Sequence, residues 1–127
     1  MKVNTKDNLA VEGFDVVEFF SGTATKGKST ISHQYKNVDY YFSSTQNREK
    51  FMYNPASYLP EYGGFCAIAM SEGKEVDANP KSFKIQDGKL YLFFREYWGI
   101  VDVKRQWNRN PDENRQLADI NWRQINR

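Results

Sequence analysis

Apolar and polar residues alternate in two stretches of the chain, and each stretch contains a turn dipeptide. Residues 31–44 are rich in Ile, Val, Tyr and Phe on either side of a Lys-Asn pair at 36–37, as in two strands joined by a turn. Residues 82–94 alternate around an Asp-Gly pair at 87–88, and Asp-Gly favours the tight turns that join antiparallel strands. The pattern therefore predicts two short antiparallel β-hairpins.

Capping residues predict several short helices before and between these hairpins. Asp15 begins a short apolar run that ends at a Ser-Gly pair, which indicates a brief helix. Ser43 is followed three residues later by Gln46, and this capping-box spacing predicts a helix over residues 44–54. The Asn-Pro pair that follows predicts another short helix over residues 55–59, because Asn is a good N-cap and Pro suits the first helical position.

Two further helical patterns lie in the C-terminal part of the chain. Ile100, Val103 and Trp107 share one face of the first. The second begins at residues 110–113, where Asn caps the helix, Pro starts it and Glu reinforces the start. Its apolar residues spread widely around the helix, so we expect it to pack on the body of the protein or on another chain. These residues are Leu117, Ile120, Trp122 and Ile125.

Together these elements predict an α+β fold, with short antiparallel hairpins packed against several short helices and two C-terminal helices. The 127 residues suit one compact domain, and no repeat or low-complexity tract divides them. We expect a single domain over residues 1–127, with a core over 8–94 and a helical segment over 95–127.

Charge gives no signal for a nucleic-acid partner. The chain has 18 basic and 16 acidic residues, and the two signs are interspersed even in its Arg-rich C-terminal part. No run approaches the roughly 20 apolar residues of a membrane span. The first ten residues contain no apolar core like that of a secretory leader. We therefore expect no nucleic acid, no transmembrane segment, and either a protein made without a leader or a chain trimmed to its mature form.

Cys66 is the single cysteine of the chain, so it has no partner for an internal disulfide. A spacing of four residues satisfies the helical and the strand period alike, so Cys66 and Met70 fall on one side in either structure. Thiolate and thioether are soft ligands suited to Cu(I), and His33 is the one imidazole that could complete a site. The candidate metal ligands are therefore Cys66, Met70 and His33, and copper is the first metal to test.

Two other interpretations of Cys66 stay open. Free Cys is among the most buried residue types and Met fills gaps in cores, so the whole stretch could be core. Alternatively, a thiol just after the Gly-Gly pair at 63–64 could lie near aligned backbone N–H groups that lower its pKa. With His33 as its base, Cys66 would then be the nucleophile of a thiol-dependent enzyme.

The aromatic residues around this segment could also line a pocket for a small organic ligand. The candidate ligand-binding residues are Tyr41, Tyr62, Gly63, Gly64 and Phe65, and Tyr40 and Tyr58 could line the same pocket.

Several separated sequence blocks stand in order over most of the chain. They are NLAVEGFDVVEFFSGTATKG, YYFSSTQNREKFMYNPASYLPEYGGFCAIAMSEGK, DGKLYLFF, and an ending in which Trp107 is followed by ADINW. In this order they resemble the YHS domain family in its small free-standing form. The resemblance implies a compact α+β domain without enzyme activity, for which heavy-metal binding is proposed and which is commonly exported in bacteria.

The resemblance also bears on single residues. In metal-associated members, the junction between strand and helix carries two cysteines, and the matching positions here are Ser43 and Asn47. Cys66 is the matching cysteine that this chain retains, within the GGFCA block typical of the free-standing form.

The leading hypothesis from sequence is a small non-enzymatic binding protein, exported to the periplasm or beyond, with a soft-metal site centred on Cys66. The alternative is a protein-interaction or structural module with Cys66 in its core, which would meet a partner or form a homodimer through the C-terminal helices. A thiol-dependent enzyme, a binder of a small organic ligand and a cytoplasmic location are the further alternatives.

Overall fold

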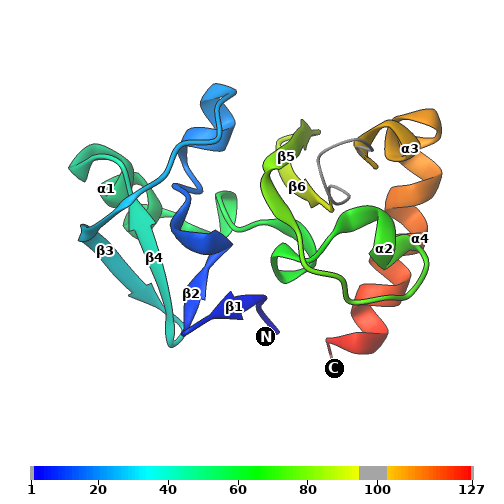
Figure 1. Cartoon of the computed structure of the whole chain (residues 1–127), viewed down its shortest axis with the longest axis horizontal. Helices are drawn as coiled ribbons and strands as arrows, with labels where there is room; N and C mark the ends of the chain where they lie inside the picture. Colours follow the sequence, from blue (N-terminus) through cyan, green and yellow to red (C-terminus); the bar gives the residue numbers. More distant parts are fainter. Residues whose placement is uncertain (1, 95–102, 127) are drawn as a thin grey trace.

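The computed structural model describes residues 2–94 and 103–126, and it has the α+β fold predicted from the sequence. Two small sheets, with helices packed against them, lie side by side along the long axis of the molecule (Figure 1). Both predicted hairpins are confirmed, as are the two C-terminal helices. Ile100, which was expected on the first of these helices, lies outside the described residues.

The first sheet has four strands in the order β1-β2-β4-β3. Its hairpin pairs β3 (Lys28–Tyr35) with β4 (Val38–Phe42), and both turn residues have positive φ, as the tight turns of hairpins require. The remaining strands are β1 (Thr5–Lys6) and β2 (Leu9–Ala10), of which β2 runs parallel to β4. The N-terminal residues thus complete a sheet whose main part is the first hairpin.

Four short helices accompany this sheet. They are η1 (Val11–Gly13), η2 (Glu18–Ser21), α1 (Thr45–Tyr53) and η3 (Pro55–Ser57). The helix predicted over residues 44–54 therefore exists, but Ser44 caps it and not Ser43: the Ser44 hydroxyl oxygen accepts the backbone N–H of Asn47 at 3.1 Å. The helix predicted over residues 55–59 is a single 3-10 turn.

Ser43 does not cap the helix because its hydroxyl donates to the fully buried carboxylate of Asp15 at 2.7 Å. The same Oδ2 accepts the backbone N–H of Ser43 at 2.8 Å and the side-chain amide of Asn47 at 2.9 Å. Oδ1 accepts the backbone N–H groups of Val17 at 2.9 Å and Glu18 at 3.3 Å. The residue at the N-cap position of η2 is Val17 and not Asp15, which was predicted there; Asp15 instead binds the backbone N–H groups at the start of η2 and ties this segment to the start of α1.

The second half of the chain contains the other sheet and the remaining described helices, of which α4 is the longest of the described structure. They are η4 (Glu61–Gly64), α2 (Ala67–Ser71), β5 (Asn79–Gln86), β6 (Lys89–Phe93), α3 (Lys104–Arg109) and α4 (Pro111–Ile125). The Asp-Gly turn between β5 and β6 has positive φ at both residues. Asn110 precedes α4 as predicted, but its side chain makes no capping hydrogen bond; its backbone carbonyl accepts the N–H of Asn114 at 2.9 Å.

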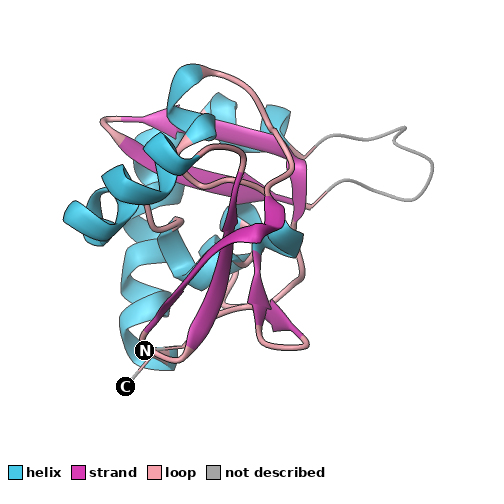
Figure 2. Cartoon of the chain, turned by 90° about the vertical axis from the view of Figure 1, so that its left-hand side faces the viewer, coloured by secondary structure: helices cyan, strands magenta, loops and turns pink. Residues whose placement is uncertain are grey.

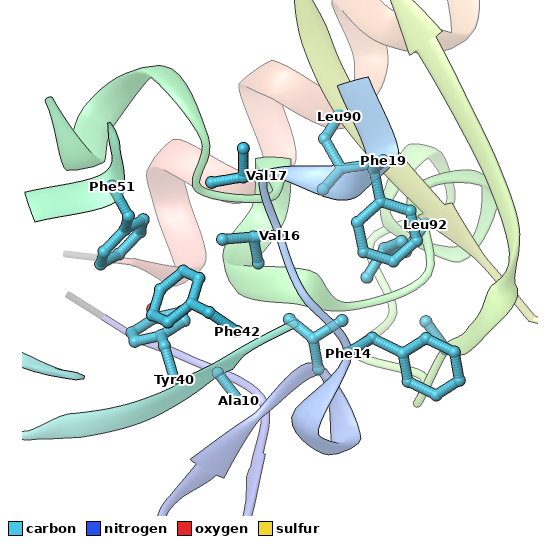
Figure 3. Close-up of a cluster of buried hydrophobic side chains, with 12 residues drawn as sticks. Ala10, Phe14, Val16, Val17, Phe19, Tyr40, Phe42, Phe51, Leu90 and Leu92 are labelled. Atoms are coloured by element: carbon cyan, nitrogen blue, oxygen red, sulfur yellow. The ribbon is translucent and has the colours of Figure 1, made fainter. Parts of the chain in front are cut away.

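Two clusters of buried side chains form the core, and β6 joins them. The first core cluster consists of Ala10, Val11, Phe14, Val16, Val17, Phe19, Tyr40, Phe42, Phe51, Ala78, Leu90 and Leu92 (Figure 3). The second core cluster consists of Tyr62, Cys66, Ala67, Ile68, Ala69, Met70, Tyr91, Phe93, Trp107 and Ala118. Since side chains of a strand alternate between its faces, β6 sends Leu90 and Leu92 to one cluster and Tyr91 and Phe93 to the other.

The two ends of the described chain lie side by side (Figures 1 and 2). The backbone N–H of Lys2 donates to the side-chain oxygen of Asn126 at 2.7 Å. The first residues therefore run next to the end of α4, and this junction forms one edge of the site described next.

Candidate functional site

A pocket of about 200 Å³ lies where β4, the turn before α2, the N-terminal segment and the end of α4 meet. Its lining is mostly apolar and includes three aromatic side chains from three separate parts of the sequence. The lining residues are Val3, Tyr40, Ala56, Leu59, Pro60, Glu61, Tyr62, Gly63, Trp122 and Asn126. We call it the Tyr62 pocket, after one of the aromatic residues in its lining.

The turn at Tyr62 and Gly63 places both residues in the pocket through an unusual backbone. Tyr62 and Gly63 have φ of +58° and +62°, and a non-Gly residue in the left-handed region is uncommon. A Cβ atom on Gly63 would overlap the carbonyl oxygen of Lys2 and press on the ring of Trp122. Only glycine therefore lets the turn come so close to both chain ends, where the Gly63 carbonyl accepts the N–H of Asn4 at 2.8 Å.

Tyr62 is fixed at both ends of its side chain. The ring is buried in the second core cluster, and the hydroxyl donates to the Asp119 carboxylate of α4 at 2.8 Å. Burial, followed by this hydrogen bond to a carboxylate, raises the pKa of the Tyr62 phenol above its usual range. Tyr62 therefore stays neutral and presents a rigid ring to the pocket.

Tyr40 supplies a phenol from the opposite wall of the pocket. It lies on β4 with only 2% of its surface exposed, and burial raises its pKa to about 12. Within the described chain, its hydroxyl makes no hydrogen bond with another residue. The Tyr40 hydroxyl is thus a polar group at the pocket wall that is accessible to a ligand.

Glu61 is the charged residue among the described residues that line the pocket. Its carboxylate lies 3.6 Å from the ammonium of Lys89 on β6. Burial raises the pKa of Glu61, although Lys89 acts in the opposite direction. The pocket therefore combines aromatic walls with one partly desolvated carboxylate.

Trp122 closes the pocket from the last turns of α4. Its ring packs against Tyr62 and Phe65, with centroid distances of 6.4 Å in both cases. Of the residues predicted to bind a ligand, Tyr62 and Gly63 line this pocket, while Phe65 packs against Trp122 and is not part of the lining. Gly64 lines a much smaller neighbouring hollow, and Tyr41 packs near Gly13 on the other side of β4. Tyr58, also considered from sequence, meets Phe20 edge to face, with ring centroids 5.4 Å apart.

Cys66 lies outside this pocket, directly before α2. Its side chain is fully buried in the second core cluster, and its sulfur accepts the backbone N–H of Phe94 at 3.1 Å. Burial raises the pKa of the thiol, although backbone N–H groups from Ala69, Phe94 and Ile68 favour the thiolate. Cys66 also borders a separate hollow of about 260 Å³, beside Phe94 and Val103. The thiol is therefore held protonated, which suits packing better than nucleophilic catalysis.

The predicted metal ligands fall into two groups. Met70 lies one helical turn after Cys66, in the same core cluster, and its N–H donates to the Cys66 carbonyl at 3.0 Å. His33 lies on β3, at the other end of the long axis (Figure 1), where its ring packs on Phe51. Cys66 and Met70 therefore come together and His33 does not join them. Within residues 2–94 and 103–126, no group of three or more His, Cys, Asp or Glu side chains could hold a metal ion.

Ser43 and Asn47, the two positions that the sequence resemblance aligned with paired cysteines, both contact one carboxylate. Ser43 and Asn47 both donate to the buried Asp15 carboxylate, and the Asn47 amide also donates to Glu18 at 2.8 Å. These two positions do converge in space, as a ligand pair would, but here they satisfy a buried carboxylate.

Comparisons with other proteins add no family to these observations. Protein-family models, curated proteins and solved structures gave no match to this chain. None of the described helices is long and apolar enough to cross a membrane.

Glu61 and Trp122, the charged and the indole side chain of the Tyr62 pocket, were not predicted from the sequence as ligand-binding residues. Glu61 directly precedes Tyr62, so its position next to a predicted ligand-binding residue could have indicated it. Trp122 lies 60 positions later in a helix whose apolar residues spread around its axis, and nothing local linked it to the Gly-Gly turn.

Proposed function

We propose that this protein is a non-enzymatic binding domain whose ligand is a small organic molecule held in the Tyr62 pocket. The observation that carries the proposal is the enclosure of one apolar pocket by Tyr40, Tyr62 and Trp122, beside a single carboxylate. Small-molecule sites are typically concave, mostly apolar and aromatic, with few polar groups that fix the ligand's orientation.

The volume of the pocket limits the size of this ligand. A cavity of about 150 Å³ is enough to bind benzene, and the Tyr62 pocket measures about 200 Å³. The pocket therefore suits a molecule of one ring or a compact branched group, and larger ligands would extend out of it. The Tyr40 hydroxyl and the Glu61 carboxylate are among the polar groups of the lining that could orient such a molecule.

A substitution that fills the pocket tests this function. Ala56 lines the pocket but is itself exposed, so Ala56→Trp should block the pocket without disturbing the core. Ser57→Trp, at the exposed neighbouring position outside the lining, is the matched control. We expect benzyl alcohol to bind wild type and Ser57→Trp in calorimetric titrations, and to bind Ala56→Trp at least about tenfold more weakly. Equal binding to all three proteins, or no binding to wild type, would contradict the proposal.

A soft-metal site at Cys66 is the second candidate function. The observation in its favour is that the Cys66 thiol and the Met70 thioether belong to one buried cluster, with Cys66 at the edge of a hollow. Its test is anaerobic titration with Cu(I) against a competing chelator, with Cys66→Ser and Met70→Leu beside wild type. One-to-one binding that is lost in Cys66→Ser would support it, and equal behaviour of wild type and Cys66→Ser would refute it.

Membership of the YHS domain family and export from the cytoplasm belong to the same proposal. The support for them is the ordered set of sequence blocks, from NLAVEGFDVVEFFSG to ADINW. The α+β fold agrees with that resemblance.

A further inference from the structure

We infer that the ligand of the Tyr62 pocket carries an alkylated ammonium group, held among the aromatic rings and opposite the Glu61 carboxylate. This inference rests on the proposed small-molecule function and adds the chemical class of the ligand.

The aromatic walls of the pocket are suited to a positive charge. Tyr62 and Trp122 stand nearly perpendicular, at 71° with centroids 6.4 Å apart, and Tyr40 lines the same pocket from β4. The face of an aromatic ring is negative, so several rings around one space attract a cation, and cages of this kind bind quaternary ammonium groups. Three rings from three segments therefore form such a cage.

Carboxylates next to the rings also favour a positively charged ligand. The Tyr62 hydroxyl donates a hydrogen bond to Asp119, so a carboxylate lies at the hydroxyl end of the ring and adds negative potential next to the pocket. Arg115 partly balances Asp119, with 3.9 Å between guanidinium and carboxylate. Glu61 is the one charged residue in the described lining, so an anionic ligand would meet repulsion there.

Glu61 is available to a cation from the pocket side. Its partner Lys89 lies 3.6 Å away and keeps 59% of its side chain exposed, and exposed ion pairs of this kind are weak. A desolvated cation inside the pocket would interact with the carboxylate in a less polar medium than the Lys89 ammonium does. A cation in the pocket and the Lys89 ammonium therefore compete for the same carboxylate.

The lining also distinguishes alkylated ammonium from primary ammonium. A primary ammonium has three N–H groups that need acceptors, and the lining offers few acceptors beside Glu61 and the Tyr40 hydroxyl. Methyl groups on the nitrogen spread the charge over C–H surface and need no such partners. The apolar walls thus suit the alkylated form.

The test compares choline with 3,3-dimethylbutan-1-ol, in which a carbon replaces the charged nitrogen, by calorimetric titration of the whole chain. We expect choline to bind at least about tenfold tighter than the alcohol, because cation–π attraction and the carboxylate act on choline alone.

Two variants locate the charge effect. Glu61→Gln should weaken choline binding at least about fivefold and leave binding of the alcohol within about twofold. Lys89→Gln should instead strengthen choline binding, because it removes the competing ammonium. Glu49→Gln removes the same charge at an exposed position of α1 and should change neither affinity.

The outcomes separate the two proposals. Equal affinities for choline and the alcohol, or an unchanged choline affinity in Glu61→Gln, would overturn the ammonium inference and leave the pocket as a small-molecule site. Failure of wild type to bind choline, the alcohol or benzyl alcohol would overturn both.

Discussion

Tyr62 shows how one residue with an uncommon backbone can position a site. Its left-handed φ is retained because the side chain is held by the second core cluster and by Asp119, while Gly63 allows the close approach of the chain ends. Strained residues of this kind gather at ligand sites, where the surrounding structure holds them in place. The sequence marked the Gly-Gly turn as special, but only the structure connects it to Trp122.

At the same scale, Cys66 yields a prediction about reactivity and pH. Because burial raises its pKa, the thiolate fraction of the folded protein is lower than that of a free thiol at every pH up to the raised value. We expect alkylation by iodoacetamide at pH 7.5 to be at least about tenfold slower than for the urea-unfolded chain, and to rise with pH beyond the ordinary thiol range. Deprotonation of the thiol is less favourable in the folded than in the unfolded chain. The resulting contribution to the free energy of unfolding is present at neutral pH and is lost as pH rises through the folded pKa. Rapid labelling of the folded protein would instead support a thiol enzyme.

Asp15 yields a second prediction, on stability. Asp15→Asn replaces one acceptor oxygen by an NH₂ group, so it leaves some of the donors from Val17, Glu18, Ser43 and Asn47 without a partner. The expected loss in the free energy of unfolding is at least about 2 kcal/mol, because buried unsatisfied groups are costly.

Urea denaturation measures the effect of Asp15→Asn. The control is Glu49→Gln on the exposed side of α1, which should stay within about 0.5 kcal/mol of wild type. A loss for Asp15→Asn no larger than for the control would show that the network around Asp15 contributes little.

At the scale of elements, α4 belongs to the core. Ala118 is fully buried, and Trp122 and Ile125 pack against the second core cluster. The Asn121 amide donates to the carbonyls of Met70 at 2.8 Å and Ser71 at 3.2 Å, so it satisfies the end of α2. Leu117 and Ile120 stay 44% and 47% exposed, and the homodimer expected through the C-terminal helices remains a prediction.

The contact between α4 and α2 can be tested with one side chain. Asn121→Ala removes two hydrogen bonds to helix-end carbonyls and should lower the free energy of unfolding by about 1–2 kcal/mol. Gln124→Ala, at an exposed position of the same helix, should have little effect in the same denaturation experiment. If the two variants were equally stable, α4 would not be held by this contact.

The elements that sequence predicted are those with strong local signals. Asp87-Gly88 and the alternation around it fixed the second hairpin, and Pro111 marked the start of α4. The two-residue strands β1 and β2 have no local signal, because they form only against each other and against β4. Strand alternation also decides that Tyr40 and not Tyr41 faces the pocket, and the sequence did not reveal which face of β4 was buried.

At the scale of the whole molecule, the Tyr62 pocket lies where distant segments meet. Val3 comes from the start of the chain, Tyr40 from the first sheet and Trp122 from the last helix. A ligand that touches all three binds the folded state alone, so we expect bound ligand to stabilise the fold as a whole. This arrangement could not be predicted from any single stretch of sequence.

A ¹H–¹⁵N correlation spectrum titrated with benzyl alcohol shows whether a small organic molecule binds in the Tyr62 pocket. We predict saturable shifts of the Trp122 indole and the Gly63 amide, both of which belong to pocket-lining residues. The Trp107 indole, which donates to Gln86 at 3.1 Å outside the pocket, should not move. Shifts confined to the surroundings of Cys66 and Phe94, or no shifts at saturating probe, would show that the Tyr62 pocket does not bind such a molecule.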